Sequence, residues 1–388
     1  MKSSPAAPQL SPSGRSSRSA NAVQNRWPEG KGGPAQGTAQ EYVLTFLPND
    51  DESLSAFVDR VLNEVRRRAG SVLMVMAYGS TQAHAGVMNH LSRQLGKVQW
   101  PVLWVEGQSC GPHPIAGFQV FILPSAQVQR LTLGEQVVGN VFSDADARHC
   151  LVAGLTPLDP REPRATQCAQ FFASAERVLE DAGFVFGDIA RTWFYNDEIL
   201  AWYDDFNRER TGFYKKQKFR SGSLPASTAV RGKNPRGAAL TFGAWAVVPH
   251  SSERQLVTEL ASPLQCPAPA YGSSFSRAVE ISSGGKKRVL VSGTASIEPG
   301  GKTVWQGEVE KQIALTMDVV EAILRPRGLG FFEVTRATAY FKKAADMAVF
   351  RRWQAAHGLE TMPVVPVNCD ICRDDLLFEI ELDACSTS

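Results

Sequence analysis

A regular alternation of apolar and acidic residues marks the chain near its C-terminal end. Residues 378–383 read F-E-I-E-L-D, and this period of two predicts a strand with one buried face. No Lys or Arg interrupts Glu379, Glu381 and Asp383, so these acids must either face water or line a cleft. A carboxyl group in a dry cleft has a raised pKa and can donate a proton near neutral pH. An edge strand with a solvated acidic face is the alternative.

The hydrophobic pattern also repeats within the chain. Residues 165–195 superpose on residues 310–340 at a constant shift. Each copy predicts an amphipathic helix, a Gly just after it, a short loop and a strand. The matched pairs include Gln167 and Gln312, Gly183 and Gly328, Arg191 and Arg336, and Tyr195 and Tyr340.

Further periodic segments indicate an α+β fold. We expect strands packed against one layer of helices, because helical and strand patterns occur together in each copy. The remaining predicted elements are helices at 196–214, 343–357 and 54–65, and strands at 42–46 and 71–76.

The last strand of the repeat, which carries the acids in the second copy, differs between the two copies. Aligning Arg236 with Arg373 places Phe242 opposite Glu379. On this alignment the first copy keeps the strand and lacks the acids. The difference predicts that the first copy has a structural role and that the second copy carries the functional site.

The composition divides the chain into three parts. Residues 1–40 are rich in Ser, Pro, Gly, Ala and Gln and have few bulky apolar residues, which predicts a disordered tail. Residues 41–250 are expected to form an N-terminal α+β domain that contains the degenerate repeat. Residues 251–388 are expected to form a C-terminal domain with the acidic strand.

Charge and cysteine content narrow the classes of function. The net charge of +2 over 388 residues gives no reason to expect nucleic acid or an anionic membrane as a partner. No apolar run approaches the ~20 residues that cross a bilayer. Seven cysteines are scattered along the chain without a secretory signal, which favours reduced thiols in a cytoplasmic protein.

Residues 263–384 resemble the YjgF/RidA family. The resemblance implies tandem chorismate-mutase-like barrels, which in that family form trimers with ligand clefts between neighbouring barrels. Glu379 then falls on the family's cleft glutamate. Val364 stands where family imine deaminases have an Arg, and Phe275 replaces the opening Tyr, so imine deamination is not expected. The matching segments are A-Y-G-S-S-F-S-R-A at 270–278, L-V-S-G-T-A-S-I at 290–297 and F-E-I-E at 378–381.

After residue 40 the chain is most similar to the chorismatase family. Chorismatases remove the enolpyruvyl group of chorismate without a cofactor. One branch hydrolyses chorismate to a dihydroxycyclohexadiene carboxylate, and the other forms 3-hydroxybenzoate and pyruvate. The resemblance therefore implies an enzyme with chorismate as its small-molecule partner. The matching segments are W-Y…F-N…R…F-Y within 202–214, P-A-S-T-A-V at 225–230, F-S-R-A at 275–278 and C-R-D-D-L-L-F-E-I-E at 372–381.

The chorismatase resemblance and the chemistry together suggest roles for individual residues. Glu379 is the candidate general acid for the exocyclic methylene, kept protonated by apolar neighbours such as Phe275. Cys372 occupies the place of a Cys that accompanies the 3-hydroxybenzoate branch. Arg210, on an otherwise aromatic helix face, is the first candidate clamp for the two carboxylates of chorismate. The further substrate-binding candidates are Tyr214, Arg191 and Arg277.

The sequence predicts no cofactor and no metal. It has neither a dinucleotide fingerprint nor a P-loop, and the single CxxC of Cys369 and Cys372 has no second pair. Chorismate hydrolysis and metabolite binding without turnover remain alternatives to 3-hydroxybenzoate synthesis. A monomer and a homotrimer are both compatible with the sequence, because fused copies already satisfy part of a trimer interface.

Overall fold

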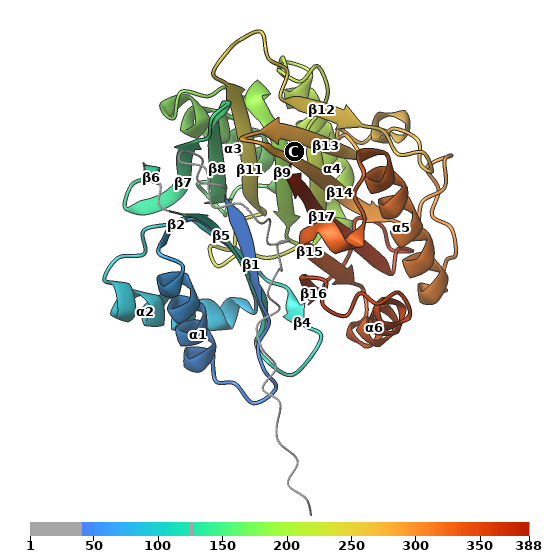
Figure 1. Cartoon of the computed structure of the whole chain (residues 1–388), viewed down its shortest axis with the longest axis horizontal. Helices are drawn as coiled ribbons and strands as arrows, with labels where there is room; N and C mark the ends of the chain where they lie inside the picture. The colour runs from blue at the N-terminus through green and yellow to red at the C-terminus, as the bar shows by residue number, and fades with distance from the viewer. Residues whose placement is uncertain (1–40, 125–127, 388) are drawn as a thin grey trace, which may run out of the picture.

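The computed structural model describes residues 41–124 and 128–387, and the predicted disordered tail at 1–40 lies outside them. Within the described residues the strands form three sheets, each covered on one face by helices (Figure 1). We name the three parts the N-terminal unit (41–124), the middle unit (128–249) and the C-terminal unit (257–387). The predicted α+β class is therefore confirmed. No helix in these ranges is long and apolar enough to cross a membrane.

The C-terminal unit contains the acidic strand. Its elements are β12 (Val257–Leu260), β13 (Ala278–Ser283), β14 (Lys286–Ala295), α5 (Val309–Leu324), β15 (Val334–Phe341), α6 (Met347–Ala356), β16 (Val364–Asn368) and β17 (Phe378–Thr387). The sheet order is β12-β13-β14-β17-β15-β16, and β4 (Gln108–Ser109) of the N-terminal unit extends it beside β16. Phe378, Ile380 and Leu382 of β17 belong to the apolar core that includes residues of α5 and α6. Because β17 is central, the edge-strand alternative is excluded.

The middle unit has the same topology. Its elements are β6 (Gln129–Leu133), β7 (Gln136–Ser143), β8 (Ala147–Leu155), α3 (Arg164–Asp181), β9 (Ile189–Asn196), α4 (Ile199–Tyr214), β10 (Ala226–Arg231) and β11 (Leu240–Pro249). The sheet order is β10-β9-β11-β8-β7-β6, and β9 and β10 are parallel just as β15 and β16 are. The repeat predicted from sequence is thus a repeat of structure.

The N-terminal unit is a shortened version of the same arrangement. Its elements are β1 (Tyr42–Phe46), α1 (Leu54–Arg67), β2 (Gly70–Gly79), α2 (Thr81–Leu95), β3 (Val102–Val105) and β5 (Ile115–Pro124). The sheet order is β1-β5-β2-β3, with β2 and β3 parallel. Side chains of β2 are buried on both faces, which explains its unbroken apolar sequence. The described chain therefore holds a third unit beside the two predicted copies.

The inner faces of the three sheets meet at a cluster of three tyrosines. Tyr78 of β2, Tyr195 of β9 and Tyr340 of β15 are fully buried and come one from each unit. The Tyr195 hydroxyl lies 2.9 Å from that of Tyr78 and 3.1 Å from that of Tyr340. Tyr195 and Tyr340 are also paired by the sequence repeat. The three units are thus arranged around a common centre, like the three barrels of a trimer.

The strand registers correct the predicted alignment of the two copies by one residue. Tyr195 pairs with Thr241 across β9 and β11, whereas Tyr340 pairs with Glu379 across β15 and β17. Thr241, and not Phe242, is therefore the counterpart of Glu379. Phe242 belongs to the core under the helices of the middle unit, because successive side chains of a strand point to opposite faces.

Candidate active site

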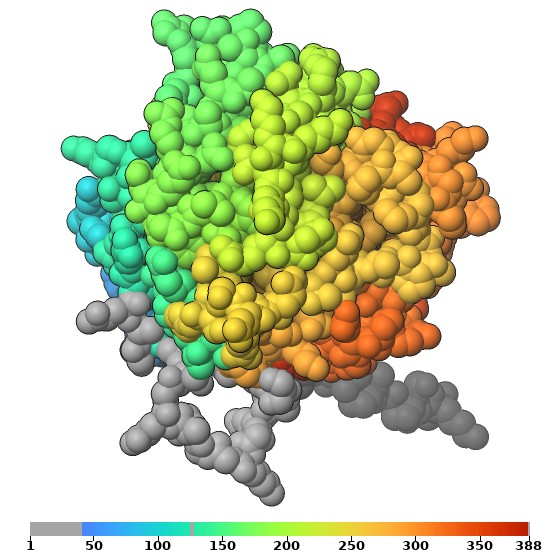
Figure 2. Space-filling model, turned by 90° about the horizontal axis from the view of Figure 1, so that it is seen from above, coloured from blue at the N-terminus to red at the C-terminus, as the bar shows by residue number. Residues whose placement is uncertain are grey.

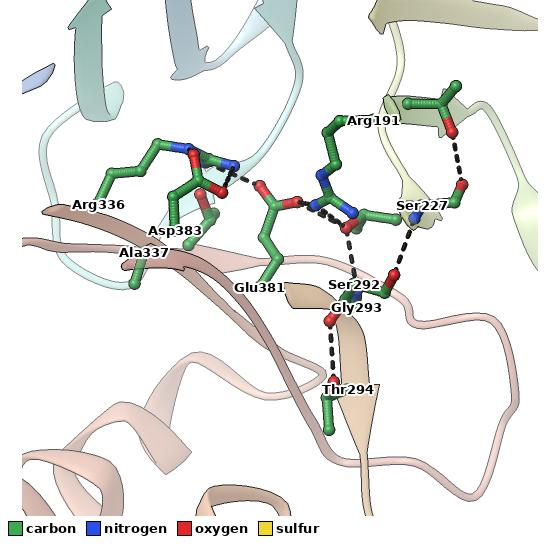
Figure 3. Close-up of polar contacts among 12 residues, drawn as sticks. Arg191, Ser227, Ser292, Gly293, Thr294, Arg336, Ala337, Glu381 and Asp383 are labelled. Carbon is green, nitrogen blue, oxygen red and sulfur yellow. Dashed lines mark hydrogen bonds and ion pairs between the residues drawn. The ribbon is translucent and has the colours of Figure 1, made fainter. Parts of the chain in front are cut away.

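The acids of β17 are buried between the middle and C-terminal units, and two of them are neutralised there. Figure 3 shows Glu381 between two guanidinium groups, with Arg191 on one side and Arg336 on the other. Arg336 also donates hydrogen bonds to Asp383 at 2.5 and 3.2 Å. Burial alone would raise the pKa of Glu381, but the charges of Arg336 and Arg191 outweigh it and hold this pKa below its ordinary value.

Glu379 is the acid of β17 that remains without a cation. Among the described residues its carboxyl group has neither a hydrogen bond nor an ion pair, although only 5% of the residue is exposed. Burial, and secondly the negative charge of Glu381, raise the pKa of Glu379 to about 8. Arg191, Arg277 and Arg373 oppose this increase without cancelling it. Glu379 is therefore protonated at neutral pH, which a general acid requires.

The Glu379 carboxyl group lies directly against the backbone of Gly293 in β14. A Cβ atom added to Gly293 would lie 2.1 Å from Oε1 and 3.0 Å from Cδ of Glu379. The N–H of Gly293 donates a 3.1 Å hydrogen bond to the Thr228 hydroxyl of the middle unit. Gly293 thus permits the close approach of the acid and joins the two units beside it.

Glu379 opens onto a pocket at the junction of the middle and C-terminal units. Figure 2 shows these two units meeting across one face of the molecule. The middle unit contributes α4 and β10, and the C-terminal unit contributes β14, β17 and the loops before β13 and β17. The lining residues are Tyr203, Arg210, Ser227, Ala229, Tyr271, Ser273, Phe275, Arg277, Gly293, Ala295, Ile297, Cys372, Arg373 and Glu379.

Arg210 reaches the pocket from α4. Its guanidinium is centred 5.0 Å from the Phe206 ring and donates a 2.7 Å hydrogen bond to the side-chain oxygen of Asn207. Only 1% of the residue is exposed, and no carboxylate of the described residues lies within salt-bridge distance. A buried guanidinium without a counterion is costly, so Arg210 is placed to receive an anion from outside.

Two more guanidinium groups lie on the C-terminal side of the pocket. Arg277 donates two 3.0 Å hydrogen bonds to the Cys266 carbonyl, and Arg373 donates one of 2.8 Å to the Gly301 carbonyl. Both lie over the Tyr271 ring, at 5.3 and 5.4 Å. Among the described residues neither has a carboxylate within salt-bridge distance. The pocket therefore combines three uncompensated cations with one neutral acid.

Cys372 lines the same pocket as a neutral thiol. Burial, and secondly the charge of Glu379, raise the pKa of Cys372 to about 12. Its partner in the CxxC sequence, Cys369, belongs instead to the central apolar core. A neutral thiol is a weak nucleophile and behaves as a small apolar group.

The pocket brings together most of the residues predicted from sequence, but not all. Glu379, Cys372, Arg210, Phe275 and Arg277 line it. Two further candidates lie elsewhere.

Arg191 is fully buried in its ion pair with Glu381, where it also donates a 2.6 Å hydrogen bond to the Thr228 hydroxyl. Tyr214 packs into the aromatic core of the middle unit, 5.3 Å from the Phe219 ring. Neither side chain reaches the pocket.

Nine of the fourteen residues that line the pocket were not predicted as site residues, among them two tyrosines and an arginine. Tyr203, Tyr271 and Arg373 all stand inside segments that carried the family resemblances, but no rule of spacing separates them from their neighbours. Arg373 had a direct signal, since it follows Cys372 and precedes Glu379 in the chain segment that enters the site.

Comparison with known proteins supports this architecture. The Endoribonuclease L-PSP family matches residues 267–386. Protein DfrA of Myxococcus xanthus is 31% identical over 123 residues, which cover 31% of this chain and 90% of that protein. The chain thus carries a YjgF/RidA-like domain at its C-terminal end.

Longer matches extend beyond that domain. A 3-hydroxybenzoate synthase of Streptomyces hygroscopicus is 25% identical over 263 residues, 61% of this chain and 74% of that protein. A chorismatase of the same organism is 26% identical over 216 residues, and the chain spans only 60% of its length. A crystal structure of a chorismatase superposes with a TM-score of 0.63 at 19% identity, covering 90% of this chain and all of that one, and it shares the fold.

The structure and these matches together define an α+β protein of three related units, with a YjgF/RidA-like unit at the C-terminal end and a buried acid where that unit meets the middle unit. Beyond its YjgF/RidA-like C-terminal domain, the chain is similar in sequence to a 3-hydroxybenzoate synthase and a chorismatase and has the fold of a chorismatase.

Proposed function

We propose that this protein converts chorismate to 3-hydroxybenzoate and pyruvate without a cofactor, with Glu379 as the general acid. The observation that carries the proposal is a carboxyl group with a pKa of about 8 in a pocket with three unpaired guanidinium groups. Chorismate brings two carboxylates and an enol ether, so it supplies the missing anions and the group that needs a proton. The name of the 3-hydroxybenzoate synthase relative supports this product, and that of the chorismatase relative supports this substrate.

The chemistry begins with proton transfer from Glu379 to the exocyclic methylene carbon. The enol ether becomes an oxocarbenium-like leaving group, and its bond to ring carbon C3 breaks as pyruvate departs. The neighbouring C4 hydroxyl oxygen attacks C3 and returns its proton to the Glu379 carboxylate. The C4–O bond then opens, the oxygen that stays on C3 takes up a proton, and the hydrogen on C3 leaves as a proton, which makes the ring aromatic. All atoms of chorismate are retained in the two products.

Cys372 supports this outcome by excluding water. Attack by water at C3 would give the hydrolysis product, so the face of the ring opposite the leaving group must stay dry. A thiol with a pKa of about 12 is neutral and poorly hydrated, which suits this role better than nucleophilic addition.

Substrate entry requires side chains to move. The free space in the pocket is about 40 Å³, well below the few hundred Å³ usual for small-molecule sites. Tyr271 and Arg373 are partly exposed at its border, and we expect them to rotate outward when chorismate binds.

The test is to incubate the purified full chain with chorismate alone and to measure pyruvate together with the aromatic product by chromatography. We expect equal amounts of pyruvate and 3-hydroxybenzoate. Glu379→Gln should lower kcat by ~10²–10⁴-fold, the usual contribution of a general acid. Circular dichroism and the melting temperature serve as the control for folding.

Two other results would overturn parts of the proposal. Pyruvate with a dihydroxycyclohexadiene carboxylate would assign the protein to the hydrolase branch and remove the role of Cys372. Tight chorismate binding without pyruvate would show a metabolite-binding protein. Wild-type activity in Glu379→Gln would exclude this residue as the acid.

A further inference from the structure

A second pocket lies where the C-terminal unit meets the N-terminal unit. Its volume is about 370 Å³, within the range of small-molecule sites. It lies between the end of β1, helix α6 and strand β16. The apolar side chains that line it include Leu47, Met347, Phe350, Met362, Val364 and Pro366.

The strand registers show that this pocket is the counterpart of the catalytic pocket. Ala229 of β10 pairs with Phe194, and Pro366 of β16 pairs with Ala339, which is the repeat equivalent of Phe194. Ala229 lines the catalytic pocket, and Pro366 lines the second pocket. In the same way, Ser227 in the catalytic pocket is the repeat equivalent of Val364 in the second pocket. Each pocket therefore lies over the same positions of a parallel strand pair.

The second pocket lacks the acid. Tyr340 of the three-tyrosine cluster pairs with Glu379, whereas Tyr78 of the same cluster pairs with Gly117. A Cβ atom at Gly117 would lie 2.9 Å from both methyl groups of Val365 and 2.9 Å from the Phe46 carbonyl oxygen. A carboxylate side chain does not fit there, so this junction can bind a molecule but has no proton donor in the catalytic position.

Two polar groups of the second pocket lack partners. Thr45 is 5% exposed, and its hydroxyl has no hydrogen-bond partner among the described residues. Arg351 of α6 has no carboxylate within salt-bridge distance in the described part of the chain. Arg60 is already paired with Glu52 at 2.7 Å. Glu360 contributes one exposed carboxylate to the lining.

We propose that this pocket is a second, non-catalytic site for aromatic monocarboxylates. The Phe350 ring and its aliphatic neighbours suit a flat apolar body. Arg351 supplies a cation for one carboxylate, and the Thr45 hydroxyl supplies a hydrogen-bond donor that burial leaves unsatisfied. The proposal names a ligand class from this pocket alone and does not rest on the catalytic function.

Methionine methyl groups provide a site-specific test. Met347 and Met362 line the second pocket, whereas no methionine lines the catalytic pocket. The full chain, labelled with methyl-13C methionine, is titrated with 3-hydroxybenzoate and with benzoate, and the two signals are identified through Met347→Leu and Met362→Leu. We expect saturable shifts of both signals with either ligand, and the same dissociation constant in Glu379→Gln.

Variants on α6 separate the carboxylate contact from general charge effects. Arg351→Ala should weaken binding about tenfold or more, the usual loss for a hydrogen bond to a charged group. Arg352→Ala removes a neighbouring exposed cation that does not line the pocket, and it should leave the affinity unchanged. Thr45→Val should weaken binding less than Arg351→Ala. Unshifted Met347 and Met362 signals at millimolar ligand, or equal affinity in Arg351→Ala, would overturn the proposal.

Discussion

At the scale of single residues, the neighbours of a carboxyl group decide what it can do. Glu379 and Glu381 lie on the same face of one strand and are both buried. Glu381 has two guanidinium partners and an acidic pKa, whereas Glu379 has none and a pKa of about 8. The same residue type is therefore an ionic link between units in one position and a protonated carboxyl group, the proposed proton donor, in the next.

The raised pKa predicts an alkaline limit to activity. Because Glu379 must be protonated to act, kcat/KM should be constant below its pKa and fall as pH rises through about 8. The measurement is a pH profile of pyruvate release at constant ionic strength. An activity that instead falls as pH decreases toward 6 would contradict a protonated Glu379.

The same pKa predicts a change in stability. The folded value lies above the ordinary value of 4.5, so the folded state holds the proton more tightly, and stability should decline from about pH 4.5 to about pH 8. In Glu379→Gln the side chain does not titrate, so the variant lacks this pH-dependent change in stability. Its melting temperature should therefore rise relative to wild type across that range, and a constant difference would argue against the raised pKa.

Gly293 provides a test of geometry that leaves every polar group in place. In Gly293→Ala the new methyl group would displace the Glu379 carboxyl, which lies at the end of a flexible side chain, so activity should fall ~10²-fold with little loss of stability. Gly212→Ala in α4 is the matched control, because its Cβ would contact nothing within 4 Å. Normal activity in Gly293→Ala would show that the carboxyl position is not critical.

Where strand period and family motif agreed, as for Glu379 and Cys372, the predicted residues line one pocket, and their roles stay predictions. Arg191, predicted as a substrate contact, does not line this pocket. The repeat aligned this residue with Arg336, which was a sign of a shared structural role, and both guanidinium groups indeed bind Glu381. Tyr214 was misplaced because an aromatic helix face is equally typical of a core, and its burial depends on helix α3 and the loop beyond α4.

At the scale of elements, β17 carries both the proposed general acid and the contacts that assemble two units. Its apolar face packs under α5 and α6, and its acidic face joins the middle unit. The alternation was readable from sequence, but the partners were not, since Arg191 lies 190 residues away. Helix boundaries were also approximate: the helix predicted at 196–214 begins at Ile199, and that at 343–357 spans Met347–Ala356.

The two functions of β17 are predicted to be electrostatically coupled. Glu381→Gln removes a negative charge that raises the pKa of Glu379, so the alkaline limit of activity should move to lower pH. Leaving Arg191 without its carboxylate should also cost roughly 3–5 kcal/mol of stability, whereas Arg336 keeps its pair with Asp383. Asp383→Asn is the control, because Asp383 pairs with Arg336 and is not among the main causes of the raised pKa of Glu379, so the limit should stay near pH 8. Equal limits in both variants would contradict the coupling.

At the scale of the whole molecule, one chain supplies three units around a shared centre. The sequence revealed two of them, because Arg and Tyr recur at matched positions in β9 and β15. The N-terminal unit keeps Tyr78 but has Met74 four residues earlier, where the other units have Arg, and it is shorter. Only the strand order and registers reveal its relationship to the others.

This arrangement predicts a monomer. The inner faces of the three sheets already cover one another, and the large exposed apolar residues of the described chain are scattered over several elements. Light scattering coupled to gel filtration should give a mass near 42.3 kDa. Three times that mass, independent of protein concentration, would show that a further interface exists.

The three-tyrosine centre has a consequence for how such a molecule changes over generations. In a trimer of identical chains every substitution occurs at all three junctions at once, so no junction can acquire a property that harms the others. A fused chain removes this restriction. Glu379, Thr241 and Gly117 now occupy the corresponding positions of the three units, and selection can retain an acid at one junction while the other two are free to acquire different chemistry.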